Sequence, residues 1–134
     1  MSNLANFSEE LLLTWLLTAS SATRPTAWYV ALHMSDPGEA GGAGEVSTAE
    51  DLDYVRKAIT FADPVADSGQ VVSTNSQSWT VDVASAGYTV THVSIKDAAT
   101  SGNTLFKAPL PVPRALVAAQ VMTFGTGDLI CALA

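Results

Sequence analysis

The chain has 134 residues, of which 48% are hydrophobic and only 14% are charged, and its formal charge at pH 7 is -7. That length suits one domain, residues 1–134, which buries a core without disulfides or metal; the single cysteine, Cys131, allows no intramolecular disulfide. The net charge and the scatter of the six basic residues count against direct nucleic-acid binding, because duplex affinity comes from Lys and Arg neutralising phosphates.

Residues 1–19 contain the one predicted helix, over residues 3–19, with Asn3 or Asn6 as its N-cap. Apolar residues recur in it at helical spacing: Leu4, Phe7, Leu11 and Trp15. The apolar run from Leu11 to Leu17 is too short to cross a bilayer, which takes about 20 residues. Because no basic head of a secretory signal precedes it, we expect a soluble chain made in a cytoplasm, with no membrane contact.

The second half of this helix is apolar nearly all round, because Leu13 and Leu17 lie off the stripe that contains Trp15. Docking one helix face on a sheet does not need so much apolar surface. Two interpretations remain open. The helix is sunk under its own sheet, or Leu13, Trp15 and Leu17 contact another subunit.

Residues 27–134 are predicted to be β-rich, after a small-residue connector at residues 20–26. The predicted strands are Ala27–Met34, Tyr54–Phe61, Gln70–Asn75, Ser78–Val83, Tyr88–Ile95, Thr104–Phe106, Leu116–Phe124 and Leu129–Leu133. Residues 62–69 read as a turn, and the prolines at 109, 111 and 113 indicate a sheet edge or an extended connection. This order predicts a mainly β fold, an antiparallel β-sandwich or jelly-roll-like domain with one N-terminal α-helix.

Residues 35–50 form a long, acidic, glycine-rich loop. No Lys follows its glycines, which counts against a phosphate-binding loop, and it lacks the alternating oxygen ligands of a calcium-binding EF-hand. Loops of this length are usually functional or disordered. We therefore expect it to become ordered against a neighbouring subunit, with Asp36, Glu39 and Glu45 as contact residues.

No catalytic constellation is evident in the sequence, and we expect no catalytic residues, no metal and no cofactor. His33 and His92 lie in separate strands without metal-ligand spacing, and His33 reads as a hydrogen-bonded structural histidine. Cys131 sits in an apolar run and is interpreted as a small apolar residue, not a nucleophile. Trp28 is left open as a core residue or a sugar-stacking platform.

Several segments together are similar to one protein family. They are LANFSEELLLTWLL, YVALHMSDPG, GEVS, YVRKAITF, THVSIKDAATSGNTLF and FGTGDLICAL. In these segments the chain resembles a family of small tailed-bacteriophage virion proteins, variously named tail fibre, head decoration or capsid cement proteins. It departs from the family pattern in its proline-rich residues 109–113 and at Gln120, where a glycine is common.

The resemblance implies a structural protein that assembles symmetrically on a virion and catalyses nothing. The leading hypothesis is a capsid cement or decoration protein on the capsid surface, assembled in the host bacterial cytoplasm. It would be a homotrimer that clamps and stabilises the lattice of the phage major capsid protein, with the helix and loop residues named above as subunit or capsid contacts. The alternative is a tail-fibre or tail-tip module that binds host surface carbohydrate, with Trp28 as its stacking residue.

Overall fold

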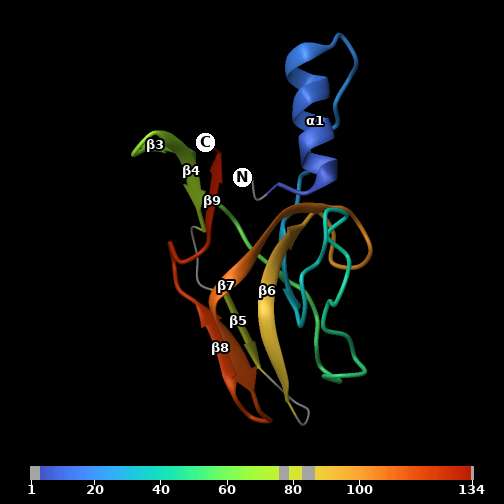
Figure 1. Cartoon of the computed structure of the whole chain (residues 1–134), viewed down its shortest axis with the longest axis vertical. Helices are drawn as coiled ribbons and strands as arrows, with labels where there is room; N and C mark the ends of the chain where they lie inside the picture. The colour runs from blue at the N-terminus through green and yellow to red at the C-terminus, as the bar shows by residue number, and fades with distance from the viewer. Residues whose placement is uncertain (1–3, 76–78, 83–86, 134) are drawn as a thin grey trace.

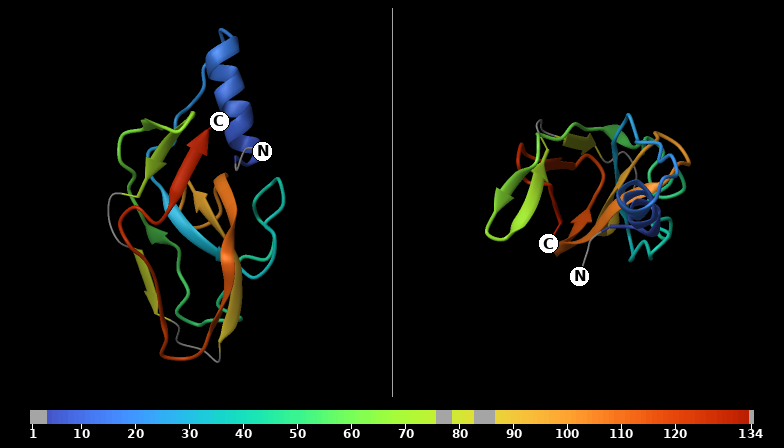
Figure 2. Two further views of the ribbon diagram at one scale, coloured as in Figure 1. Left: turned by 60° about the vertical axis from the view of Figure 1, so that its left-hand side comes forward. Right: turned by 90° about the horizontal axis from the view of Figure 1, so that it is seen from above.

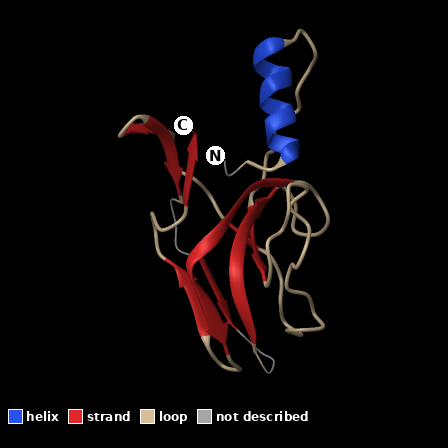
Figure 3. Ribbon diagram, in the orientation of Figure 1, coloured by secondary structure: helices blue, strands red, loops and turns tan. Residues whose placement is uncertain are grey.

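The computed structural model describes residues 4–75, 79–82 and 87–133, which form one helix and nine strands (Figures 1 and 3). The elements are α1 (Asn6–Leu17), β1 (Tyr29–His33), β2 (Lys57–Ala58), β3 (Val65–Asp67), β4 (Gln70–Thr74), β5 (Trp79–Asp82), β6 (Tyr88–Lys96), β7 (Thr104–Leu116), β8 (Val121–Phe124) and β9 (Ile130–Leu133). Every pairing among the described strands is antiparallel. The predicted fold class, mainly antiparallel β with one N-terminal helix, is confirmed.

The strands form three sheets. Their orders are β2-β1-β6-β7, β3-β4-β9 and β5-β8. Seen from above, the β3-β4-β9 sheet lies across from the four-stranded sheet, and α1 is seen end-on over the four-stranded sheet (Figure 2). The hairpin of β6 and β7 is the longest pairing, and β1 adds to β6 so that His33 lies opposite His92. β1 is therefore a central strand, which explains why both of its faces are apolar.

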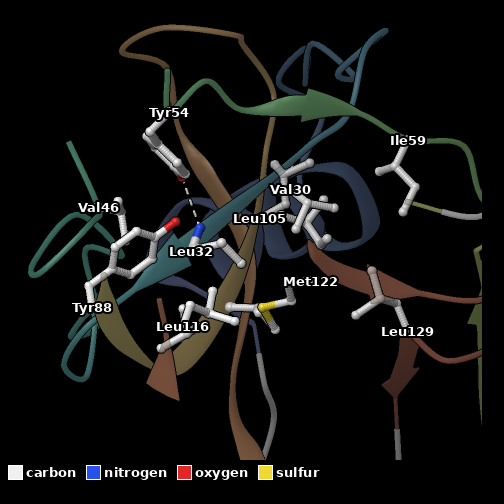
Figure 4. Close-up of a cluster of buried hydrophobic side chains, with 13 residues drawn as sticks. Val30, Leu32, Val46, Tyr54, Ile59, Tyr88, Leu105, Leu116, Met122 and Leu129 are labelled. Atoms are coloured by element: carbon white, nitrogen blue, oxygen red, sulfur yellow. Dashed lines mark hydrogen bonds between the residues drawn. The ribbon is translucent and has the colours of Figure 1, made fainter. Parts of the chain in front are cut away.

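The core gathers apolar side chains from β1, β6, β7 and β8 and from the segment between β1 and β2. Val30, Leu32 and Val90 are completely buried there. Figure 4 shows Tyr54 turned into this cluster, where its hydroxyl accepts a hydrogen bond from the Leu32 backbone N–H at 2.9 Å. That bond satisfies the phenol inside an apolar layer, so Tyr54 packs as a core residue.

Two predictions in the middle of the chain are wrong. The strand expected at residues 54–61 shrinks to β2, because the Tyr54 N–H donates to the Asp51 carbonyl in a turn and its side chain enters the core. The turn expected at residues 62–69 contains β3, which pairs with β4 through a two-residue turn at Ser68 and Gly69. Both turn residues have positive φ, 49° and 87°, as tight hairpins need.

The strand expected at residues 116–124 is also divided. A turn separates β7 from β8, held by the Gln120 N–H donating to the Val117 carbonyl at 3.1 Å, with Ala119 at φ 65°. β7 instead runs through the three prolines and is the edge strand of its sheet. The prediction that this proline segment lies at an edge is confirmed.

Candidate assembly surface

Helix α1 stands on the end of the β structure, attached mainly at its base (Figure 1). The Ala5 N–H donates to the Leu105 carbonyl of β7 at 3.1 Å, and the Asn6 N–H donates to the Glu39 carbonyl at 3.1 Å. Ser8 is the one buried residue of the helix. The interpretation in which α1 is sunk under its own sheet is therefore wrong.

The second half of α1 exposes large apolar side chains nearly all round its axis, and we call this end of the helix the α1 tip. Its side chains and their exposed fractions are Leu13 at 56%, Trp15 at 68%, Leu16 at 64% and Leu17 at 76%. Burying a large apolar side chain stabilises by about 1.5–3 kcal/mol. Covering the exposed parts of four such side chains would therefore contribute on the order of 5 kcal/mol to an association.

The helix is poorly equipped to remain a helix on its own. It has 12 residues, near the lower limit at which an isolated helix is even marginally stable. Ala5 occupies the N-cap position and makes no side-chain cap bond, so the predicted cap by Asn6 is wrong, while Asn3 lies outside the described residues. Only the C-terminal end is capped, by the Thr18 hydroxyl donating to the Thr14 carbonyl at 2.8 Å. Packing of the α1 tip against a partner would supply the missing stability.

An apolar groove of about 510 Å³ opens between the four-stranded sheet and the β3-β4-β9 sheet. Its lining consists of Trp28, Thr60, Phe61, Ala62, Pro64, Val71, Ser73, Ile95, Leu105, Phe106, Cys131 and Leu133. We call this set the intersheet groove. The pairs Val71–Leu133 and Ser73–Cys131 lie opposite each other in β4 and β9, so this face of the sheet points into the groove. Sequence reasoning missed the groove, because the two linings come from distant parts of the chain.

Cys131 contributes a neutral thiol to this groove. Burial raises its pKa to about 12, so the thiolate needed for nucleophilic chemistry is scarce at neutral pH. The side chain is half-buried and packs against the core. Both observations support its interpretation as an apolar packing residue.

The acidic loop at residues 35–50 is ordered by its own chain, contrary to the prediction. Its backbone pairs with β1, with the Val46 N–H donating to the Leu32 carbonyl at 2.9 Å. The carbonyl of Gly41 accepts bonds from the buried Lys96 ammonium at 2.8 Å and from the Thr104 hydroxyl at 2.9 Å. A Cβ at Gly41 would overlap the Thr104 side chain, and φ there is 75°, so only glycine fits.

Glu45 is an internal anchor and not an exposed contact residue. Arg56 forms a bidentate ion pair with the Glu45 carboxylate, in which Nε donates to Oε1 at 2.6 Å and an Nη donates to Oε2 at 2.8 Å. Arg56 also donates to the carbonyls of Ala98 and Ser101 in the β6–β7 turn. Burial alone would raise the pKa of Glu45, but the hydrogen bonds and charge of Arg56, with the charge of Lys96, outweigh it and lower that pKa. Arg56 thereby ties the acidic loop to the hairpin.

The other two acidic candidates remain at the surface. Glu39 forms an ion pair with Lys107 at 2.6 Å, and the Glu39 side chain is still 67% exposed. Asp36 accepts the Gly38 N–H at 2.8 Å, and this bond lowers its pKa. The structure therefore leaves Leu13, Trp15 and Leu17 exposed on the α1 tip. It places the backbone of Glu39 at the helix base and Glu45 in the interior.

His33 is a structural residue, as predicted. Its Nδ1–H donates to the Ala43 carbonyl at 2.8 Å, and Nε2 accepts from the Ser94 hydroxyl at 2.8 Å. Burial lowers its pKa, which keeps the ring neutral. The Ser94–His33 pair resembles half of a catalytic triad, but both side chains are essentially inaccessible to a substrate.

Within residues 4–75, 79–82 and 87–133 there is no group of three or more His, Cys, Asp or Glu side chains able to hold a metal ion. In the same part of the chain no helix is long and apolar enough to span a bilayer. The features left to explain are the α1 tip and the intersheet groove.

A family model described as podophage GP4 fiber I protein gp80 matches residues 3–132 of the chain. The match covers α1, β1 to β8 and all of β9 except its last residue, Leu133. No curated protein matches the chain.

Proposed function

This chain belongs to the podophage GP4 fiber I protein gp80 family, and on that premise we propose that it is a structural subunit of a phage tail fibre. Membership in this family makes the chain a structural protein of a tailed phage, as the sequence resemblance implied. The family description favours the tail-fibre alternative over the capsid cement hypothesis that the sequence placed first.

The single observation that carries a mechanism is the exposed α1 tip. Four large apolar side chains, each more than half exposed, gather on a short helix that projects from the β structure. Monomeric proteins rarely expose a patch of this kind, and larger patches mark interaction sites. The subunit attaches to the fibre by burying the α1 tip against a neighbouring virion subunit, and its role is mechanical, without catalysis.

Carbohydrate binding has weaker support than protein contact. Trp28, the stacking residue expected for a sugar site, is partly buried and packs against the core. Only Thr60 and Ser73 are polar in the groove that Trp28 lines. Sugar sites need several convergent polar groups for orientation, and this groove offers few.

Copy number in purified virions tests the location. A fibre subunit is expected at a few to a few dozen copies per particle, measured by quantitative mass spectrometry against the major capsid protein. Hundreds of copies would instead support the cement hypothesis and refute the tail location.

Incorporation into particles tests the attachment surface. The variant Leu17→Ser is expected to be depleted from virions, whereas Leu52→Ser should be incorporated normally. The two leucines are matched, since they are 76% and 78% exposed, and only Leu17 lies on the α1 tip. Equal incorporation of both variants would show that the α1 tip is not the attachment surface.

A further inference from the structure

We propose that the α1 tip of one copy of this chain occupies the intersheet groove of a second copy. This rests on the proposed function, because it names the partner of the same surface. The structure contains an apolar helix with no groove around it and an apolar groove with no helix in it.

The helix is held so that it points away from its own groove. Leu4 forms a bridge with Phe106, and the Ala5 N–H bonds the Leu105 carbonyl, while Leu105 and Phe106 both line the groove. The base of α1 is thus fixed at the groove wall, and the helix runs outward from it (Figures 1 and 2). To enter its own groove, α1 would have to give up these backbone bonds.

The two surfaces match in chemistry. None of the twelve groove-lining side chains is charged, and α1 carries no charge from Leu11 to Leu17. Each surface would lose no ion pair and would desolvate few polar groups on contact. A charged or strongly polar partner would leave its own groups unpaired in this groove.

The surfaces also match in size. One large aromatic or aliphatic side chain buries on the order of 150–250 Å², so the four side chains of the α1 tip bury roughly 500 Å². With a similar area from the groove, one contact covers about 1,000 Å², the lower bound for a specific interface. Since every copy has one helix and one groove, a reciprocal pair or a closed ring uses both and doubles the area per copy.

The oligomeric state of the full-length protein, measured by analytical ultracentrifugation, gives the first test. We expect an oligomer that dissociates at least tenfold more readily in a helix variant, Trp15→Ser with Leu17→Ser, and in a groove variant, Val71→Arg. The control Val65→Arg should leave assembly unchanged, because Val65 is a 60% exposed valine on the neighbouring strand that does not line the groove.

Mixing the two defective proteins gives the decisive result. The helix variant keeps an intact groove, and the groove variant keeps an intact helix, so together they are expected to form a heterodimer that neither forms alone. Loss of assembly in the helix variant with full assembly in the groove variant would mean that helices pair with each other. That outcome, a monomeric wild type, or no heterodimer on mixing would each overturn the proposal.

Cys131 provides an independent reporter, because it is the one native cysteine and lies in the groove. Cysteines introduced singly at Leu13, Leu16 and Leu17 are expected to give a disulfide-linked dimer at one or more positions on oxidation with copper phenanthroline at about pH 9. At that pH the exposed helix thiol is ionised and supplies the thiolate that the buried Cys131 does not. The dimer should disappear in a Cys131→Ser background and should not form with Leu52→Cys. Absence of a Cys131-dependent dimer at all three positions would refute the proposed contact.

The two proposals fail separately. If Leu17→Ser is depleted from virions while the isolated wild type is monomeric and never crosslinks, the α1 tip binds a different virion protein and only the second-copy proposal is lost. If the isolated protein assembles as described but particles contain hundreds of copies, the tail-fibre assignment is lost and the helix–groove contact stands.

Discussion

Replacing Arg56 by alanine tests the mostly buried ion pair between Arg56 and Glu45. The Arg56 and Glu45 side chains are only 10% and 18% exposed, and their closest atoms are 2.6 Å apart. Removing one partner of a buried pair costs about 3–5 kcal/mol, whereas an exposed pair contributes about 0–1 kcal/mol. Because this pair is mostly but not fully buried and Arg56 also bonds two carbonyls, we expect Arg56→Ala to lower the free energy of unfolding by about 3 kcal/mol.

Urea unfolding followed by circular dichroism measures this loss. The matched control is Glu39→Ala, which removes an ion pair of the same length, 2.6 Å, at its exposed partner, since the Glu39 side chain is 67% exposed and the Lys107 side chain only 16%. It should cost less than about 1 kcal/mol. Equal losses in the two variants would refute the view that burial makes the Arg56 pair important.

The pH dependence adds a second check. Arg56 contributes to keeping the pKa of Glu45 below its ordinary value of 4.5, so the stability gained from ionised Glu45 is present above that value and is lost as the pH falls through the lowered pKa. The difference between wild type and Arg56→Ala should therefore narrow as the pH falls below about 4.5. A difference that stays constant down to pH 3 would contradict the assignment.

Three further predictions concern single positions. Burial lowers the pKa of His33 below 6.5, so the unfolded chain binds a proton before the folded chain does, and the free energy of unfolding should fall as the pH drops from about 6.5. In urea titrations between pH 7 and pH 5.5, His33→Gln should lose less stability than the wild type. The same pH dependence in both proteins would refute this role of His33. Gly41→Ala should cost more than about 1 kcal/mol, because the new methyl overlaps Thr104 at positive φ, whereas Gly42→Ala, with open space around it, should be nearly neutral in the same assay. Asn75→Ala should cost about 2–4 kcal/mol, because the fully buried amide of Asn75 bonds two backbone groups of the turn before β9; a loss below about 1 kcal/mol would mean that the turn holds without it.

The β strands were the most predictable part of the chain, because their signal is local. In β6 and the start of β7, β-branched and aromatic residues flank a turn with Gly102 and Asn103, and the hairpin forms there as expected. β2 is shorter than the strand predicted at residues 54–61, because Tyr54 lies in a turn and its hydroxyl accepts a hydrogen bond from the Leu32 N–H of β1. That partner lies 22 residues earlier, beyond the reach of a periodicity argument.

The candidate site was predicted in part, for a similar reason. The all-round apolar pattern of α1 indicated Leu13, Trp15 and Leu17 as contact residues, and the structure leaves all three exposed, while the contact itself stays a prediction. The pattern is the same for a helix sunk under a sheet and for one projecting from it. The backbone hydrogen bond from Ala5 to Leu105 determines that the helix projects from the sheet, and these two residues lie 100 positions apart in the sequence. Likewise, the sequence indicates that Glu45 is a surface acid and that Arg56 and Tyr54 share one strand face. It gives no sign that both side chains donate hydrogen bonds to the Glu45 carboxylate.

The three prolines of β7 have a consequence for how such subunits crowd together. Proline has no backbone N–H, so Pro109, Pro111 and Pro113 remove three hydrogen-bond donors from the edge strand of the four-stranded sheet. Neighbouring copies concentrated on one particle cannot add strand to strand along this segment, the route by which β proteins aggregate. This part of the edge lacks the backbone donors that strand pairing needs. Contact between copies there depends on side chains, whose shape and polarity determine which neighbour binds.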